Sequence, residues 1–499
     1  MIRWFSRRDS AVSVAAVGKA LGKETRKGTT VPPTLLRALR RIVGAENLIT
    51  RPSELIVYEC DGYTLEKETP PAVVFPKSTE ATAAVVRACR EHGVPVLPRG
   101  AGTGLAGGAT PLHGCVVVSL ARMKRILEIS PRDRMVHVQA GVLNLELGSV
   151  LAGTYWHFAP DPSSQAACTI GGNIATNAGG PHTLKYGVTV NHILGMTWVT
   201  GEGEVLEIGP ETNSAEFDWI GLLTGSEGTL GIATEAWLRL TPLPIAHRTF
   251  RATFDRVEDA GNAVSRIIAA GVIPAAMELL DRGILQALEE AFHFGFPADA
   301  EAILVVELDG MPIALDEQEG IVLQLCRDCH AKEILSASSE AERELLWHCR
   351  KSAVAAVGRL SPGYFIQDGV VPRSRLPELV RRVASIGRER GVRIVNVAHA
   401  GDGNIHPILL FDERKPDEVR RAMEAGRAIL QACIELGGSI TAEHGVGIEK
   451  LPLMTALFSR RDLDAMRRIQ RVFDPGRVMT PGKVLPPAES EAFQAAGRD

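Results

Sequence analysis

The sequence predicts an α+β protein with at least two domains, and three observations support this fold class. The chain has 499 residues, which is too many for a single hydrophobic core. From Pro70 onward a strand, an amphipathic helix and a second strand follow one another and lead into a glycine-rich loop. Beyond Pro242 and Pro244 the chain alternates strands with helices, which favours an antiparallel sheet with helices on one side.

The individual elements follow from hydrophobic periodicity and from start and stop signals. Ser78 is the expected N-cap of a helix that ends at Gly93, between the two strands of a β-α-β unit. Further helices are expected at 33–44, 257–271 and 462–473. Strand-like runs cover 72–76, 94–100, 115–120, 135–141, 192–200, 204–209, 230–240, 248–254, 275–281 and 300–310.

The composition is that of a globular protein and argues against several function classes. Hydrophobic residues make up 45% and charged residues 23% of the chain, both ordinary values. A formal net charge of −4 gives no electrostatic reason to expect nucleic acid or an anionic membrane surface as a partner. No apolar run reaches the length of a spanning helix, and the eight cysteines are scattered, as in a reducing compartment. We therefore expect a cytoplasmic protein, with residues 1–30 as a flexible leader.

The glycine-rich loop that follows Pro98 is the first candidate binding site. Gly102, Gly104 and Gly107 match G-x-G-x-x-G, but the chain runs on through "GATPLHGCVVVSL" into a strand, whereas a Rossmann turn requires a helix there. A loop this rich in glycine can still turn successive N–H groups towards one anion. Further glycine-rich stretches, "CTIGGNIATNAGG" and "TGSEGTLGI", indicate one long ligand that contacts all three segments.

The stretch "HAGDGNIHP" predicts a β-hairpin, because Asp-Gly between extended apolar runs is a strong tight-turn signal. With Asp402 and Gly403 as the two turn residues, His399 and His406 would be directly opposed, with Cβ atoms about 5 Å apart. Such a pair either shares a metal ion or forms hydrogen bonds within a half-buried sheet. Glu443, in "SITAEHGVGIEK", is a candidate third ligand. Two histidines with a carboxylate suit a divalent transition metal such as zinc or manganese.

Arg350 occupies an otherwise apolar stripe on the helix "ERELLWHCRKSAVAAVGRL". A guanidinium in such a stripe is costly unless it meets an anion, and its planar fork suits a carboxylate. Two interpretations stay open at this point. Arg350 binds the carboxylate of a substrate, or it forms a structural salt bridge with a nearby Asp or Glu.

The order of the motifs "PRGAGTGLAGG", "PDPSS…TIGGNIATNAGG…KYG" and "TGSEGTLGI" resembles the FAD-binding domain of the vanillyl-alcohol oxidase/p-cresol methylhydroxylase superfamily. Within it, the chain is most similar to the FAD-linked 2-hydroxy-acid dehydrogenases, and in particular to the FAD-linked subunits of bacterial glycolate oxidases, from about residue 30 to 485. The resemblance implies a two-subdomain FAD-binding domain at 31–242, an antiparallel-sheet substrate (cap) domain at 243–440, a C-terminal helical segment returning to the FAD domain at 441–485, and a tail at 486–499.

The resemblance also implies where the cofactor lies. The glycine loop would wrap the pyrophosphate of a noncovalent FAD, since covalent attachment in some relatives uses a histidine of this loop and none lies between Arg99 and Gly108. Thr480 stands where the family has asparagine, whereas Lys483 is retained. The implied FAD contacts are Pro98, Arg99, Gly100, Ala101, Gly102, Thr103, Gly104, Gly107, Gly108, Ala109, Ser163, Ser164, Gly171, Gly172, Asn173, Asn177, Gly179, Gly180, Tyr186, Gly187, Glu227, Gly228, Gly231, Ile232 and Lys483.

For catalysis, the resemblance implies oxidation of a small 2-hydroxy acid, glycolate to glyoxylate, with hydride transfer to flavin N5. His444 would face the substrate as the general base and Arg350 would hold its carboxylate. Relatives that take 2-hydroxyglutarate carry lysine where Ile366 lies, which favours a small monocarboxylate here. The implied metal ligands are His399, His406 and Glu443.

The resemblance implies partners as well. Companion redox subunits, including an iron–sulfur protein, would pass electrons to membrane quinones and would hold the chain at the inner face of the membrane. A D-lactate dehydrogenase of the same superfamily is the nearest alternative, since one methyl group is worth only about 1–3 kcal/mol of discrimination. The alternative from another class is a non-catalytic FAD-binding scaffold subunit, although a scaffold has no use for Arg350 together with the histidine cluster.

Overall fold

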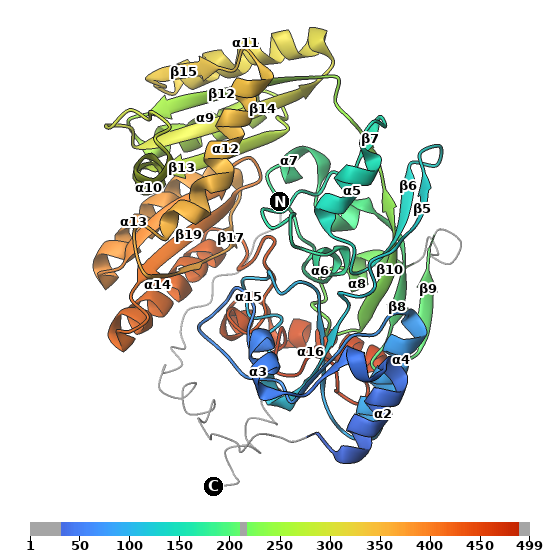
Figure 1. Ribbon diagram of the computed structural model, residues 1–499. Helices are drawn as coiled ribbons and strands as arrows, with labels where there is room; N and C mark the ends of the chain where they lie inside the picture. The colour runs from blue at the N-terminus through green and yellow to red at the C-terminus, as the bar shows by residue number, and fades with distance from the viewer. Residues whose placement is uncertain (1–30, 210–216, 489–499) are drawn as a thin grey trace.

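The computed structural model describes residues 31–209 and 217–488, so the expected leader lies outside the described part of the chain. Three larger sheets and a two-stranded ribbon organise the fold. In Figure 1 the N-terminal elements, coloured blue to green, lie on one side of the molecule, and the eight-stranded sheet with its helices, coloured yellow to orange, lies on the other. This arrangement confirms the α+β prediction. Over the described ranges, no helix has both the length and the apolar character needed to cross a membrane.

The first sheet contains the predicted β-α-β unit. Its elements are α2 (Pro33–Val43), β1 (Leu48–Ile49), α3 (Pro52–Leu55), β2 (Ala72–Val74), α4 (Thr79–Glu91), β3 (Val96–Arg99) and β4 (Val116–Ser119). β2 and β3 both run parallel to β4, which lies between them, and α2 and α4 share one hydrophobic core against the sheet. Ser78 caps α4 as expected, because its Oγ accepts the Ala81 N–H at 3.2 Å.

A five-stranded antiparallel sheet follows, in the order β5-β6-β10-β8-β9, with a small ribbon of β7 and β11 beside it. Its elements are β5 (Ile126–Ser130), β6 (Met135–Gln139), α5 (Asn144–Leu151), β7 (Trp156–His157), α6 (Ile170–Thr176), α7 (Thr183–Tyr186), β8 (Ile193–Val199), β9 (Val205–Ile208), α8 (Trp219–Leu223), β10 (Ile232–Arg239) and β11 (Thr241–Pro242). Helix α6 forms inside a stretch that the sequence indicated as a glycine-rich segment, because Thr169 caps it by accepting the Gly172 N–H at 3.2 Å.

The eight-stranded sheet begins just beyond Pro244, where the sequence predicts a change of architecture. Its strands are β12 (Ala246–Phe254), β13 (Ala276–Asp281), β14 (Ala302–Gly310), β15 (Glu333–Ser336), β16 (Gly363–Ile366), β17 (Gly369–Val370), β18 (Arg393–His399) and β19 (Asn404–Phe411). The order is β15-β12-β14-β13-β18-β19-β16, with β17 also paired to β19. Every pairing is antiparallel, as expected.

Helices cover both faces of this sheet, so the prediction of helices on one side is wrong. One face packs against α9 (Val257–Ala269), α11 (Pro312–Asp328), α13 (Leu376–Arg390) and α14 (Pro416–Glu435). The other face packs against α10 (Arg282–Phe292) and α12 (Glu340–Val357). The physical reason is visible in β13, where Leu279 enters the first core and Leu280 the second. A strand that is apolar on both faces needs cover on both.

The C-terminal segment returns to the first sheet. After α15 (Met454–Leu457) and α16 (Arg460–Phe473), the chain runs beside β3, where the Val96 N–H donates to Val478 O at 2.7 Å and the Thr480 N–H donates to Val96 O at 2.8 Å. Figure 1 shows these red elements among the blue ones. Glu227, from the segment before β10, accepts the Val446 and Gly447 N–H groups at 2.7 and 2.8 Å and ties the start of this segment to the same half of the molecule.

Candidate active site

The loop after β3 leaves its backbone N–H groups available to a ligand. Within the described chain, no N–H from residues 100–108 donates to a protein acceptor. The loop's carbonyl groups are instead held by buried cations. The Arg99 guanidinium donates to Ala109 O at 3.0 Å, and Lys483 Nζ donates to Gly108 O at 2.6 Å. A row of unused N–H groups is a backbone nest for an anion such as a pyrophosphate.

A cavity of about 690 Å³ joins this loop to the eight-stranded sheet. Pockets for small molecules and cofactors usually measure about 300–1,000 Å³. Asn173 lines the cavity and buries an Nδ2 that has no acceptor among the described residues, so a ligand acceptor would complete its hydrogen bonding. These features fit the expected FAD. The predicted cofactor contacts on the cavity wall are Pro98, Arg99, Gly100, Ala101, Gly102, Thr103, Gly104, Gly108, Ala109, Ser163, Ser164, Gly171, Gly172, Asn173, Glu227, Gly228, Gly231 and Ile232.

The remaining predicted cofactor contacts lie off the cavity wall. They are Gly107, Asn177, Gly179, Gly180, Tyr186, Gly187 and Lys483. Gly107 has a φ of +76°, and a Cβ there would lie 2.3 Å from the Ile448 side chain. Asn177 ends α6 in the left-handed conformation at a φ of 53°, and the Tyr186 hydroxyl donates to Asp309 of β14. Several glycine-motif residues thus serve close packing between segments, which sequence spacing cannot distinguish from ligand contact.

The predicted hairpin exists, but its register differs from the expected one. β18 and β19 pair His399 with Asn404 rather than with His406, so the turn spans residues 400–403 and the two histidines are diagonal neighbours on one face. Their ring centroids are still only 5.1 Å apart, with the planes at 87°. The wider turn arises because its first residue donates its N–H to Met277 O of β13 at 2.8 Å, a contact that local sequence does not reveal.

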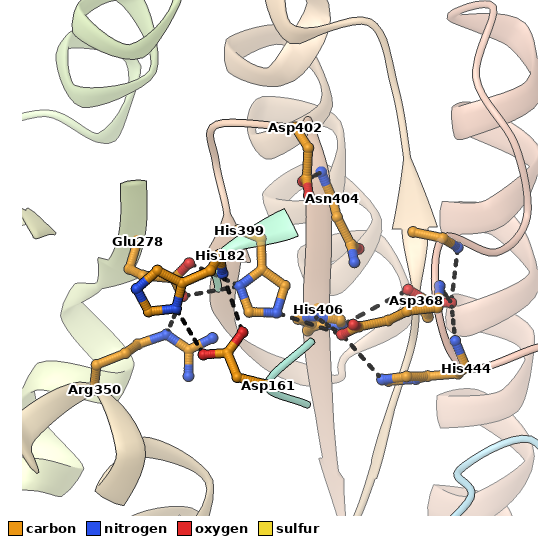
Figure 2. A network of polar contacts seen from close by, with 12 residues as sticks. Asp161, His182, Glu278, Arg350, Asp368, His399, Asp402, Asn404, His406 and His444 are labelled. Carbon is orange, nitrogen blue, oxygen red and sulfur yellow. Dashed lines mark hydrogen bonds and ion pairs between the residues drawn. The ribbon is translucent and has the colours of Figure 1, made fainter. Parts of the chain in front are cut away.

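Glu443 completes the histidine pair. Its Oε1 lies 3.4 Å from His399 Nε2 and 3.3 Å from His406 Nε2, and one ligand atom from each of the three residues lies within 4.8 Å of the others. Each imidazole is oriented through its other nitrogen, since His399 Nδ1 lies 2.8 Å from Glu278 Oε1 and His406 Nδ1 lies 3.4 Å from Gln367 O. When both rings are neutral, donation from their Nδ1 atoms leaves the two Nε2 lone pairs available to a metal ion beside the carboxylate. Figure 2 shows the labelled histidines of this cluster with Glu278 beyond His399.

The imidazoles and carboxylates of this cluster stabilise each other's charges. Burial alone would lower the pKa of His399, but the Glu278 and Glu443 carboxylates outweigh it and raise that pKa well above its ordinary value. Burial would likewise raise the pKa of Glu443, but the two imidazoles hold it well below its usual range. Positive charge between these groups can come from a proton or from a divalent metal ion. The donor set of two imidazoles and one carboxylate fits the metal.

Two buried carboxylates that the sequence analysis missed hold this cluster in place. Asp368 Oδ2 accepts the backbone N–H groups of residues 442–444 at 2.9, 3.1 and 2.9 Å and so shapes the loop that carries Glu443. Glu278 lies between Arg350 and His399 and accepts a hydrogen bond from each. For Glu278 the available signal was an acidic residue in the interior of an apolar strand, "AAMELLD", because acidic residues are rarely buried without partners.

Arg350 lines the cavity, and one edge of its guanidinium already has a partner. Its Nε donates to Glu278, and the side chain is only 5% exposed. The structural salt bridge is therefore present. The two Nη atoms have no hydrogen-bond acceptor in the described ranges, so the other half of the fork remains available to an anion. The neighbouring cavity wall includes the apolar residues Val354, Ile366 and Ile408, together with Lys351.

His444 lies beside the cluster on the cavity wall. Its ring stacks on His406, with centroids 5.0 Å apart and planes at 12°, and its Nε2 lies 3.9 Å from Glu443 Oε1. Burial lowers the pKa of His444 to about 4. The imidazole is therefore unprotonated at neutral pH and has a lone pair to accept a proton.

Comparison with known proteins places this arrangement among the FAD-linked oxidases. Residues 70–209 match the family described as FAD binding domain, and residues 243–484 match FAD linked oxidases, C-terminal domain. The chain is 44% identical to glycolate oxidase subunit GlcD of Escherichia coli (strain K12), over 91% of each chain, and 36% identical to GlcD of Bacillus subtilis (strain 168), over 88% of this chain and 94% of that one. It is also 31% identical to a D-lactate dehydrogenase of Archaeoglobus fulgidus, over 84% of this chain and 94% of that one. The chain belongs to the family of FAD-linked oxidases that contains GlcD.

Solved structures with lower identity share the fold. The structure of p-cresol methylhydroxylase with substrate bound has a TM-score of 0.76 at 17% identity and covers 95% of this chain and 97% of that one. The 4-ethylphenol oxidase of Gulosibacter chungangensis has a TM-score of 0.75 at 18% identity, over 96% and 99% of the two chains. The resemblance inferred from the glycine motifs is thereby confirmed at the level of fold and family.

Proposed function

We propose that this protein oxidises a small 2-hydroxy acid, glycolate to glyoxylate, in a site held by the eight-stranded sheet. The observation that carries the proposal is that Arg350, His406, Glu443 and His444 all line the cavity that the glycine loop lines from its other side. The GlcD relatives, at 44% and 36% identity, are named as glycolate oxidase subunits, and this supports glycolate as the substrate.

Arg350 binds the substrate carboxylate in this proposal. Glu278 fixes the guanidinium through Nε, so the Nη pair is pre-oriented and can donate to both oxygens of a carboxylate. The apolar part of the wall beside Arg350 is formed by Val354, Ile366 and Ile408 and carries no cation, and the side chain of Lys351, which also lines the cavity, is exposed. A small monocarboxylate fits this wall, whereas a dicarboxylate would bury an unpaired charge.

His444 takes the hydroxyl proton of the bound substrate. Its lowered pKa keeps the ring unprotonated at neutral pH, and its position beside Glu443 places it next to the ligands that would hold the hydroxyl oxygen. A divalent metal on His399, His406 and Glu443 would polarise that hydroxyl. FAD, when bound, supplies the two-electron acceptor. The protein's own residues bind the carboxylate, orient the hydroxyl and accept the proton.

Companion subunits take up the electrons in this proposal. The closely related GlcD proteins are named as subunits, which supports an assembly, and we place an iron–sulfur protein in it as the electron acceptor. The chain itself would then be cytoplasmic and would reach the inner face of the membrane through those partners.

The test of the function is a panel of 2-hydroxy acids offered to the purified FAD protein with an artificial electron acceptor. We expect glycolate to give the highest kcat/KM, and Arg350→Lys, which keeps the charge but loses the fork, to raise KM about 100-fold, because a hydrogen bond to a charged group contributes about 1.5–3 kcal/mol. A higher kcat/KM with D-lactate would favour the dehydrogenase alternative. Flavin that stays yellow under anaerobic conditions with every acid would refute oxidation and favour a scaffold.

The metal is tested by elemental analysis of the wild type, His399→Ala and His348→Ala. His348 is exposed on the outer side of α12 and serves as the matched histidine control. We expect metal bound at close to one equivalent in the wild type and the control, and a loss of metal in His399→Ala. Equal, negligible metal in all three proteins would remove the metal from the proposal.

A further inference from the structure

In the segment from Gly179 to Gly187, both ends were expected to contact the cofactor (Gly179, Gly180, Tyr186 and Gly187), but the whole segment lies off the cavity wall. It includes α7 and belongs to the part of the chain that matches the FAD-binding domain. Its side chains contact the C-terminal domain at three separate places. A role other than cofactor binding is therefore needed for this segment.

The first contact is with β14. Lys185 Nζ donates to Asp309 O at 2.7 Å and also reaches the Asp309 carboxylate, and the Tyr186 hydroxyl donates to the other oxygen of that carboxylate. Asp309 is almost fully buried. Neighbouring residues of α7 thus grip one buried acidic group of the eight-stranded sheet.

The second contact is with α12, the helix that carries Arg350. His182 Nδ1 lies 2.7 Å from Asp161 Oδ2, and its Nε2 lies 3.5 Å from Glu307 Oε1. The His182 ring also stacks on Trp347, with centroids 5.3 Å apart, while the Trp347 indole N–H donates to Glu307 at 2.7 Å. Trp347 and Arg350 are three residues apart and therefore neighbours on one side of the helix. Figure 2 shows the Asp161–His182 pair in the same view as Arg350.

The third contact is with the proposed metal ligands. A Cβ built on Gly401, in the turn between β18 and β19, would lie 2.5 Å from Leu184 Cδ2, so α7 packs directly on the turn of the histidine hairpin. A Cβ built on Gly179 would lie 2.9 Å from Glu443 Oε2. The segment thus abuts the hairpin that carries both histidines and the carboxylate that completes the cluster.

We infer that Asp161 and residues 179–187 form a clamp that positions the substrate half of the site over the cofactor half. The clamp holds β14 through Asp309 and Glu307, α12 through Trp347, and the histidine hairpin through Gly401. Its residues touch neither cofactor nor substrate; they are positioning residues for Arg350 and for the metal ligands. The inference rests on the proposed function in one respect only, namely that Arg350 binds the substrate carboxylate.

The test compares Tyr186→Phe, Lys185→Met and Lys185→Arg with the wild type. Gly148→Ala on α5 is the matched control, since a Cβ there has nothing within 4 Å. We expect full FAD content in all of them, a rise of about tenfold in KM with little change in kcat for Tyr186→Phe and Lys185→Met, and a return towards the wild-type KM in Lys185→Arg. Loss of FAD at unchanged KM would indicate that Tyr186 supports cofactor binding and would contradict the clamp. An unchanged KM in every variant would also overturn the clamp.

A second measurement separates the clamp from the proposed function. If the wild type oxidises no 2-hydroxy acid, the proposed function fails, and the clamp is judged by unfolding alone. We expect flavin fluorescence and far-UV circular dichroism to report one coincident unfolding transition in the wild type and separate transitions in the double variant Lys185→Met/Tyr186→Phe. Coincident transitions in the double variant would overturn the clamp.

Discussion

Glu278 offers the sharpest test of the energetics of this site, because it is a buried carboxylate shared by a guanidinium and an imidazole. The perturbation is Glu278→Gln, which keeps the shape of the side chain and removes its charge. The amide keeps one acceptor oxygen but replaces the other with an NH2 group, whose protons neither the Arg350 guanidinium nor a donating His399 Nδ1 can accept. Arg350 would then be buried without a counter-charge.

The size of the effect follows from burial. The side chains of Arg350 and Glu278 are 5% and 0% exposed, so water cannot replace the lost partner, and breaking a buried pair in this way costs about 3–5 kcal/mol. The matched control is Glu301→Gln, whose partner Arg282 is 49% exposed, and exposed pairs contribute only about 0–1 kcal/mol. His399 would also lose its charged Nδ1 acceptor, and loss of such support weakens metal binding by about 10–100-fold.

The assay is urea unfolding followed by far-UV circular dichroism, together with a metal titration of each variant. Glu278→Gln should lower the free energy of unfolding by several times more than Glu301→Gln does, and should weaken metal binding while Glu301→Gln leaves it unchanged. Equal losses of stability in the two variants would refute the argument that burial makes the Glu278 pair strong. Unchanged metal affinity in Glu278→Gln would refute its role in orienting His399.

The other predictions concern charge, cofactor retention and close packing. Burial would lower the pKa of His182, but Asp161 and Glu307 raise it from 6.5 to about 10. The stability that this contact contributes should therefore be complete below pH 6.5 and lost as the pH rises through about 10. Urea unfolding at several pH values should show that loss in the wild type but not in His182→Gln. Lys483→Met should weaken FAD binding by at least about tenfold, because the Lys483 amine donates to the carbonyl groups at the end of the glycine loop. The release of flavin fluorescence measures this binding, and unchanged binding would contradict the role of Lys483. Gly447→Ala should release FAD and destabilise the fold, since the φ of Gly447 is +52° and a Cβ would lie 1.9 Å from Ala106 O. Gly320→Ala, on the open face of α11, should instead stabilise its helix by about 0.5–1 kcal/mol. Equal Tm shifts in the two variants would contradict the argument.

Local sequence predicted the parts of the site that leave a local signal. The glycine loop after β3 and the imidazole and carboxylate groups of the cluster were identified because glycine, histidine and glutamate are unusual inside runs of strand-forming residues. The register of the histidine hairpin was not predictable in the same way. It depends on the bond from the turn to Met277 of β13, and no pattern within the hairpin encodes that partner.

The residues that sequence analysis missed or misplaced act through distant contacts. Glu278 lies inside the largely apolar β13 and Asp368 lies between β16 and β17, and only the folded chain shows that each meets several donors. Tyr186 was placed with the cofactor because the family resemblance implied that contact, yet its hydroxyl donates to Asp309 of β14. The apolar run "AILVV" in β14 indicated a strand that is apolar on both faces and therefore helices on both faces of the eight-stranded sheet, but the sequence analysis used the run only to predict a strand.

The pairing of β3 with the far end of the chain bears on how the protein acquires its flavin. Val96 receives its edge partners only from residues 478–480, so the strand that leads into the glycine loop is completed only when those residues have left the ribosome. We therefore expect cofactor loading to follow the synthesis of residues 478–480. A protease that trims the C-terminus past this point would empty the flavin pocket without touching a single residue of the loop.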